Sequence, residues 1–217
     1  NTIYEIFGKI GLGSSDPISK IIIEPFGHRF LTAMYGCKCD YRSNGEPWTV
    51  VNPLTDDEIM HLPEWTVEKL VEAEPVKEIL AQTEYIKRKY SQLQVKSLPN
   101  LGSPLNTSLG IQGDDLFYSY IDKPHIVDKF CKNIAQLMIV CMEFFPGIDN
   151  IPIRMEGIGN CSATMLSPAD YMRCNYFSDK QVHNYCSEKK MKFLLHQDSG
   201  ISPHLENYSQ LGNIDSF

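Results

Sequence analysis

The chain has 217 residues, of which 42% are hydrophobic and 22% charged, and its formal net charge is −7 at pH 7. These values match an ordinary soluble globular protein, so we expect one large domain over residues 1–217. The negative charge argues against nucleic acid as a partner, because binding a phosphate backbone needs a clustered excess of Lys and Arg.

The cysteines and the hydropathy pattern narrow the cellular setting. Seven cysteines, an odd number, are spread along the chain without the density of a small disulfide scaffold. No segment is apolar over the ~18 or more residues that a membrane helix needs, and the first residues lack a secretory signal pattern. We therefore expect a cytoplasmic protein with no membrane partner. The chain opens on Asn1 and closes on what resembles the start of a strand, so we expect a fragment of a longer chain.

The first half of the chain predicts one strand and several helices. Residues 1–25 carry few signals beyond a strand at 18–23, which a turn at 24–27 follows. Thr55 and Glu58 have the spacing of a capping box, and Pro75 fits the first turn of a helix. The helices predicted here lie around residues 29–35, 55–61, from Thr66, and from Pro75 to Tyr90.

The middle of the chain predicts a loop and then a long helix. Residues 95–113 contain Asn100, Gly102, Pro104 and Gly110, which favours a strand that enters a turn-rich loop. Loops of this kind often line sites. Apolar residues then recur at three- and four-residue steps from Pro124 until residues 146–147, Pro-Gly, and predict a helix that covers a core face.

The last third alternates between short strands and helices. Strands are predicted at 151–155, 193–195 and 213–217. Helices are predicted from Ser167-Pro168 toward Cys186, and from Ser202-Pro203 to a C-cap at Gly212. Such alternation makes neighbouring strands parallel. Because neither a G-x-G-x-x-G turn nor a Walker A sequence occurs, we favour a (β/α)8 TIM-type barrel, incomplete at the C-terminus, over an open doubly wound sheet.

In either architecture the residues just past the strands face the site, which selects residues 156–160 and 196–200. His196 and Asp198 lie two residues apart at one strand end, so both side chains can point to a common centre. An imidazole and a carboxylate suit zinc, a general base or a hydrogen-bonded pair that holds a substrate. The alternative is a histidine satisfied by backbone carbonyls beneath a loop.

Other polar residues have a functional and a plain interpretation. Glu156 can act as a general acid or base if its carboxyl is buried. The amides of Asn160 and Asn175 can orient a substrate or a metal-bound water, although turn chemistry or a solvated helix face would also explain them. Arg29 can anchor an acidic substrate group, or it is a surface arginine. Four cysteines can be soft metal ligands: Cys37, Cys39, Cys161 and Cys174. None of them has the paired C-x-x-C spacing that is typical of a zinc site.

The order of these motifs resembles the uroporphyrinogen decarboxylase superfamily, which includes the decarboxylase and corrinoid-linked methyltransferases. The likeness covers residues 26–217, and four segments carry it: Leu98–Leu105 running on to Gly113, Asp122-Lys123-Pro124 with its helix, Asn160 through Tyr171, and His196–Gly200. The last segment falls where the methyltransferases have a His-x-Cys zinc pair. Here Asp198 replaces that cysteine, and a later cysteine ligand would fall beyond Phe217.

The resemblance implies a barrel, often dimeric, and a methyltransferase that moves a methyl group between a small methylated substrate and a corrinoid carried by a partner protein. Its metal, zinc, would be held by His196, Asp198 and a third ligand, and Glu156 and Asn160 would orient the substrate. The likeness of the loop after residue 98 adds Asn100 and Ser103 to the predicted substrate-binding residues, with Arg29 and Asn175.

Two other functions stay open. The first is decarboxylation of an acidic tetrapyrrole, which needs no cofactor but needs cations such as Arg29 and Arg154. The decarboxylase's arginine-rich N-terminal segment has no clear counterpart around His28-Arg29. The second is a barrel that binds a corrinoid or tetrapyrrole without turning it over.

Overall fold

The computed structural model describes residues 20–41, 45, 47–91, 93–149, 151–198 and 200–216. The strands are β1 (Lys20–Ile22), β2 (Lys38–Asp40), β3 (Trp48–Val50), β4 (Gln94–Lys96), β5 (Met155–Gly159) and β6 (Lys192–His196). The helices are α2 (Phe30–Met34), α3 (Asp56–Met60), α4 (Val67–Glu72), α5 (Glu74–Lys89), α6 (Pro104–Gln112), α7 (Asp115–Asp122), α8 (Pro124–Asp149), α9 (Pro168–Cys174), α10 (Tyr176–Glu188) and α11 (Leu205–Ser209). Short 3-10 turns are η1 (Gly27–Arg29), η2 (Cys161–Met165) and η3 (Ser202–His204).

The described strands form separate two-stranded sheets. β1 pairs with β4 and β5 pairs with β6, both in parallel, whereas β2 and β3 form an antiparallel pair. A parallel bridge from Leu194 to Ser216 adds the start of a further strand beside β6, in the segment where the sequence predicts one. The mixed α/β class is thus confirmed. The strands do not close into a barrel within the described residues.

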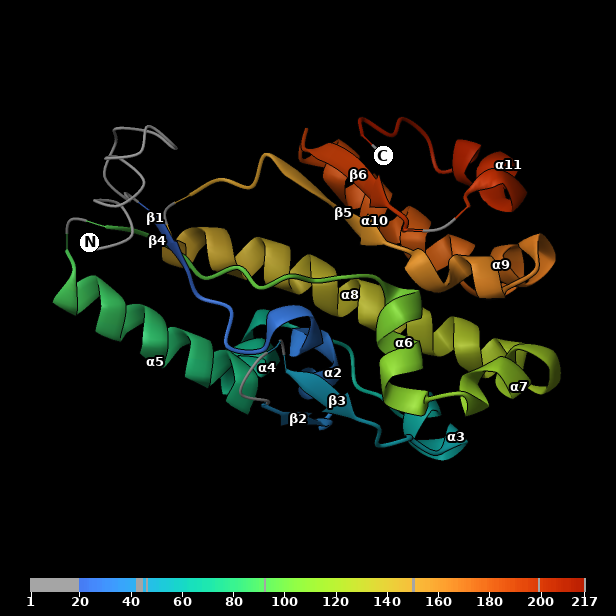
Figure 1. Ribbon diagram of the computed structural model, residues 1–217, viewed down its shortest axis with the longest axis horizontal. Coiled ribbons are helices and arrows are strands. Elements are labelled where there is room, and N and C mark those ends of the chain that lie inside the picture. The colour runs from blue at the N-terminus through green and yellow to red at the C-terminus, as the bar shows by residue number, and fades with distance from the viewer. Residues whose placement is uncertain are drawn as a thin grey trace.

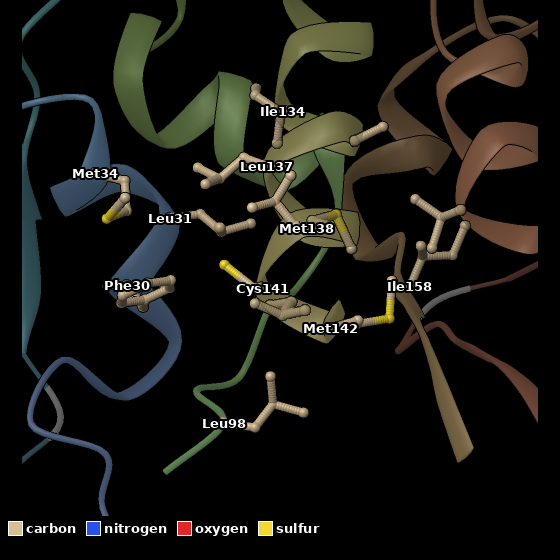
Figure 2. Close-up of a cluster of buried hydrophobic side chains, with 14 of the residues drawn as sticks. Phe30, Leu31, Met34, Leu98, Ile134, Leu137, Met138, Cys141, Met142 and Ile158 are labelled. Carbon is tan, nitrogen blue, oxygen red and sulfur yellow. The ribbon is translucent and has the colours of Figure 1, made fainter. Parts of the chain in front are cut away.

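Helix α8 lies at the centre of the core. It contacts α3, α4, α6, α7, α9 and α10, and α10 in turn packs against β5 and β6 (Figure 1). Figure 2 shows Leu137, Met138, Cys141 and Met142 of α8 between the side chains of α2 and Ile158 of β5. No helix among the described residues is both long and apolar enough to cross a bilayer.

Several predicted elements are confirmed where local signals were strong. Thr55 and Glu58 form the complete capping box at the start of α3, and α5 carries Pro75 in its first turn. Ser167 caps α9 through its hydroxyl, which accepts from the Asp170 amide at 3.1 Å. The predicted strand at 18–23 is β1 where it is described, and residues 1–19 lie outside the described residues.

Other boundaries were wrong. Residues 104–112 form helix α6 rather than a loop, with Ser103 as N-cap, and Gly110 allows Thr32 of α2 to approach closely. Helix α8 continues through Pro146 to Asp149, where the Asp149 carboxylate holds the Ser97 amide and hydroxyl. The helix predicted from 167 to 186 is interrupted at Asn175. The short helix after Pro203 ends at Ser209, before Gly212.

The strand predicted at 151–155 lies four residues later, as β5. Gly157 and Gly159 have weak strand propensity, which hid the strand from the sequence pattern. Their role is steric, because a Cβ atom at Gly157 would lie 1.9 Å from the carbonyl oxygen of Leu194 on β6. Residues 156–159 are therefore inside a strand instead of beyond its end, which changes the faces that their side chains occupy.

We expect Gly157→Ala to destabilise the protein by about 1–3 kcal/mol or more, because the added methyl group forces β5 and β6 apart. Gly159→Ala is the matched control, since a Cβ atom there meets nothing within 4 Å. Chemical denaturation monitored by circular dichroism measures both. Equal stability of the two variants would contradict the β5–β6 register.

Candidate functional site

The carboxyl ends of two parallel strand pairs, β1–β4 and β5–β6, border one cavity of about 650 Å³. This is where α/β folds with parallel strands place their sites. Each strand or the segment after it contributes lining residues: Arg29 after β1, Asn100 and Asn106 after β4, Cys161 after β5, and His196 and Asp198 at the end of β6.

The alternation of β6 decides which of its side chains reach the cavity. Phe193 and Leu195 are buried in the core, whereas Leu194, His196 and Asp198 line the cavity. Successive residues of a strand point to opposite faces, so His196 and Asp198 share the cavity face as the sequence predicts. The carbonyl oxygen of His196 also accepts a hydrogen bond from the Asn160 amide at 2.9 Å, which joins the two strand ends.

Cys161, His196 and Asp198 form a cluster of metal-ligating side chains. Their Sγ, imidazole nitrogen and carboxylate oxygen all lie within 4.8 Å of one another. His196 Nε2 is 3.0 Å from Asp198 Oδ1, and Cys161 Sγ is 3.1 Å from Asp198 Oδ2. The side chains of His196 and Asp198 are 58% and 71% exposed, so a reactant can approach them from solvent.

Burial and the bond to Asp198 both favour the protonated form of the Cys161 thiol in the metal-free protein. The Cys161 thiol donates to Asp198, and this bond, with the neighbouring His196, lowers the pKa of the carboxyl. Burial, reinforced by the hydrogen bond to Asp198, raises the pKa of Cys161. A thiol with a raised pKa is a weak nucleophile, so the cluster is poorly suited to cysteine-based covalent catalysis.

The donor set fits zinc. Thiolate sulfur, imidazole nitrogen and carboxylate oxygen are all zinc ligands, and three protein ligands leave a position open, as in catalytic zinc sites. A tetrahedral ion with bonds of about 2.0–2.3 Å places its ligands roughly 3.3–3.8 Å apart. The three donor atoms lie within 4.8 Å of one another, so closing on an ion would need their side chains to move.

Arg29 and Asn100 line the cavity, as a substrate-binding role requires. The Arg29 guanidinium lies 5.2 Å from the centre of the Trp48 ring, and its buried Nε has no hydrogen-bond partner among the described residues. Asn100 accepts a bond from the Gly102 amide at 3.0 Å and shapes the loop after β4.

Ser103, Asn160 and Asn175 are buried, and none of them is among the residues that line the cavity. Ser103 caps α6, Asn160 donates to Asp179 at 2.6 Å, and Asn175 accepts from Tyr120. Each makes a side-chain hydrogen bond inside the fold, and Asn160 Oδ1 has no hydrogen-bond partner among the described residues. Their predicted roles toward a substrate stay predictions, and their side chains lie outside the lining of this cavity.

Glu156 borders the cavity but is separated from the cluster. It pairs with Phe193 in the parallel register, whereas Gly159 pairs with His196. Paired residues share a face, so Glu156 leaves β5 on the side opposite to His196. Burial raises the pKa of the Glu156 carboxyl, and the positive charge of Lys96 partly offsets this rise. Its predicted catalytic role stays a prediction, but not in one centre with His196.

Sequence reasoning named Cys161 only as one of several possible soft metal ligands, and it missed Asn106. Cys161 lacks a second cysteine at metal-ligand spacing, and only the pairing of β5 with β6 brings it to His196. Asn106 donates to the Gly159 carbonyl at 2.5 Å and accepts from the Ser162 amide at 3.2 Å, so α6 fixes the loop that carries Cys161. The Ser-Pro pair at 103–104, like that at 167–168, was the available signal for α6.

The arrangement of these elements has a counterpart among solved structures. The fold is similar to that of a methyltransferase from Methanosarcina mazei. The TM-score is 0.62 at 12% sequence identity, and the match covers 89% of this chain and 56% of that chain. The chain thus spans little more than half the length of its structural neighbour. No family model and no curated protein sequence matches the chain.

Proposed function

We propose that the protein is a methyltransferase that moves a methyl group between a small methylated substrate and a corrinoid carried by a partner protein, as in the uroporphyrinogen decarboxylase superfamily. One observation carries the proposal: the Cys161, His196 and Asp198 donors meet at the carboxyl ends of parallel strands. The methyltransferase fold of the structural neighbour supports it. In this proposal the described strands are part of a larger TIM-type barrel.

Zinc held by Cys161, His196 and Asp198 would act as a Lewis acid toward the atom that gives or receives the methyl group. The chain's own residues supply the rest. Asp198 accepts a hydrogen bond from the Cys161 thiol in the metal-free protein, and the thiol proton must leave when the thiolate becomes a ligand. Arg29 and Asn100 line the same cavity and would orient the substrate.

The exposure of the cluster fits a reactant that a second protein delivers. His196 and Asp198 are more than half exposed, so a bulky corrinoid held by a partner can reach them without entering the core. A cavity of about 650 Å³ on the inner side has room for a small methylated substrate.

The structure gives less support to a decarboxylase. That reaction would need cations such as Arg29 and Arg154 to hold the carboxylates of one substrate. Arg154 lines an adjoining cavity of about 400 Å³ that shares Lys96, Leu98 and Met155 with the cavity of the cluster, which Arg29 lines. The two arginines therefore line different cavities, although these adjoin.

The proposal is tested with zinc-loaded protein and free cob(I)alamin as the methyl acceptor. Methanol, methylamines and methyl thioethers serve as candidate donors, and the absorbance change to methylcob(III)alamin measures transfer. The methyl group moves without its bonding electron pair, and the donor heteroatom takes up a proton. We expect transfer from one donor class, lost in His196→Ala. If no donor gives transfer and the protein binds a corrinoid or tetrapyrrole without altering it, the result would contradict methyl transfer and favour a binding module.

A further inference from the structure

A buried polar network lies directly behind the metal-ligand cluster. Asp179 of α10 is fully buried and accepts hydrogen bonds from Tyr171 of α9 at 2.7 Å and from Asn160 at 2.6 Å. Tyr208 of α11 donates to Gln197 at 3.1 Å and also interacts with the Asn160 side chain. We call these five residues the buried network: Asn160, Tyr171, Asp179, Gln197 and Tyr208.

Two members of the buried network are chain neighbours of the cluster. Asn160 immediately precedes Cys161, and Gln197 lies between His196 and Asp198. Because side chains alternate along an extended segment, Gln197 points away from the cavity when its two neighbours point into it. The Asn160 amide donates to the His196 carbonyl, so both segments are also tied to each other.

Stability alone does not explain the buried network. Burying a carboxyl disfavours its ionised form, and Asp179 has only two hydrogen-bond donors to offset that cost. Asp179 Oδ1 and Gln197 Nε2 have no hydrogen-bond partner among the described residues. A wholly apolar cluster of the same volume would cost less, which points to a functional reason for polar groups at this place.

We propose that the buried network positions the metal ligands. In this proposal Asn160 fixes the segment that carries Cys161, and Gln197 fixes the segment that carries His196 and Asp198, at ligand spacing. The proposal rests on the metal site of the proposed function. Asn160, Gln197, Asp179, Tyr171 and Tyr208 are positioning residues, because they act through the ligands and do not touch the metal. Groups that orient ligands in this way set metal affinity.

Two variants each remove one hydroxyl from the buried network. Tyr208→Phe deletes the donor to Gln197, and Tyr171→Phe deletes a donor to Asp179. Tyr120→Phe is the matched control, since Tyr120 is equally buried but donates to Asn175, outside the network. Circular dichroism and thermal unfolding establish that each variant folds.

Titration with Co²⁺ measures affinity, and its absorption spectrum reports the ligand geometry. We expect Co²⁺ to bind roughly tenfold more weakly in Tyr208→Phe and Tyr171→Phe, with altered absorption bands, and unchanged in Tyr120→Phe. Affinities and spectra equal to those of the control would overturn the positioning role.

A second measurement separates this inference from the proposed function. Failure of the wild-type protein to bind Co²⁺ or Zn²⁺ would remove the metal site and with it the proposed function. Amide hydrogen exchange in the metal-free protein then decides the positioning role. We expect faster exchange of the Asn160 amide in both network variants than in Tyr120→Phe, because its bond to His196 loosens. Equal exchange in all three variants would overturn the inference.

Discussion

Wild-type protein supplied with Zn²⁺ is expected to retain one zinc ion per chain after gel filtration, whereas His196→Ala retains almost none. His196 is one of only three donors in the cluster, so its loss removes a bond to the metal itself. The fall in affinity should exceed the roughly 10–100-fold that follows loss of a group which merely orients a ligand. Inductively coupled plasma mass spectrometry measures the zinc content.

His61→Ala is a matched control for this experiment. His61, the C-cap of α3, and Asp57 form a similar histidine–carboxylate pair at 3.3 Å, exposed to solvent, but they do not belong to the metal-ligating cluster. We expect this variant to keep its zinc. Equal zinc in His196→Ala and His61→Ala would show that the metal lies elsewhere or binds without specificity.

Asp179→Asn is expected to flatten the pH dependence of stability. Burial raises the pKa of Asp179 from its usual 3.8 to about 7, against the lowering effect of the hydrogen bonds from Tyr171 and Asn160. Tyr208, Tyr120 and Cys131 are the other titratable groups with an electrostatic interaction with this carboxylate, and each is itself buried.

The direction of this pH dependence follows from the number of protons bound by the folded and the unfolded state. Between pH 4 and 7 the folded state holds a proton on Asp179 that the unfolded state has released, so wild-type stability falls as pH rises through this window. The loss is on the order of 4 kcal/mol, from 1.36 kcal/mol per pH unit over the rise from 3.8 to about 7. An asparagine has no proton to lose, so this contribution disappears in the variant.

Denaturant unfolding at pH 5 and at pH 8 measures the effect. We expect the wild-type protein to lose about 2–3 kcal/mol more than Asp179→Asn between the two conditions, because this interval covers about two pH units below the raised pKa. Asp114→Asn is the control, because Asp114 is exposed and makes no capping bond to α7. If the wild-type protein and both variants lose the same stability between pH 5 and pH 8, the raised pKa of Asp179 in the buried network is contradicted.

Local signals in the sequence predicted several helices but missed α6 and α7. The capping box of Thr55 and Glu58 and the apolar spacing of α8 depend on residues close together in the chain, so the pattern alone identifies them. The parallel pairing of β5 and β6 was also predicted from the alternation of strands and helices. β5 itself was misplaced, because Gly157 serves a contact with Leu194 that only the folded structure reveals.

The candidate site was predicted in part. His196 and Asp198 share a strand end, so strand periodicity sufficed to bring them together. Cys161 is 37 residues from Asp198 in the chain, and no spacing rule connects them. The burial of Asn160, Asn175 and Asp179 is set by how α9, α10 and α11 pack, which polar residues in isolation do not indicate. Ser199, in the predicted site segment, lies outside the described residues.

Anomalous diffraction from crystals of the zinc-loaded protein tests the central claim most directly. The account predicts one strong zinc peak between Cys161 Sγ, the His196 imidazole and the Asp198 carboxylate, with bonds of about 2.0–2.3 Å. A fully loaded crystal whose zinc peak lies away from these three side chains would contradict it.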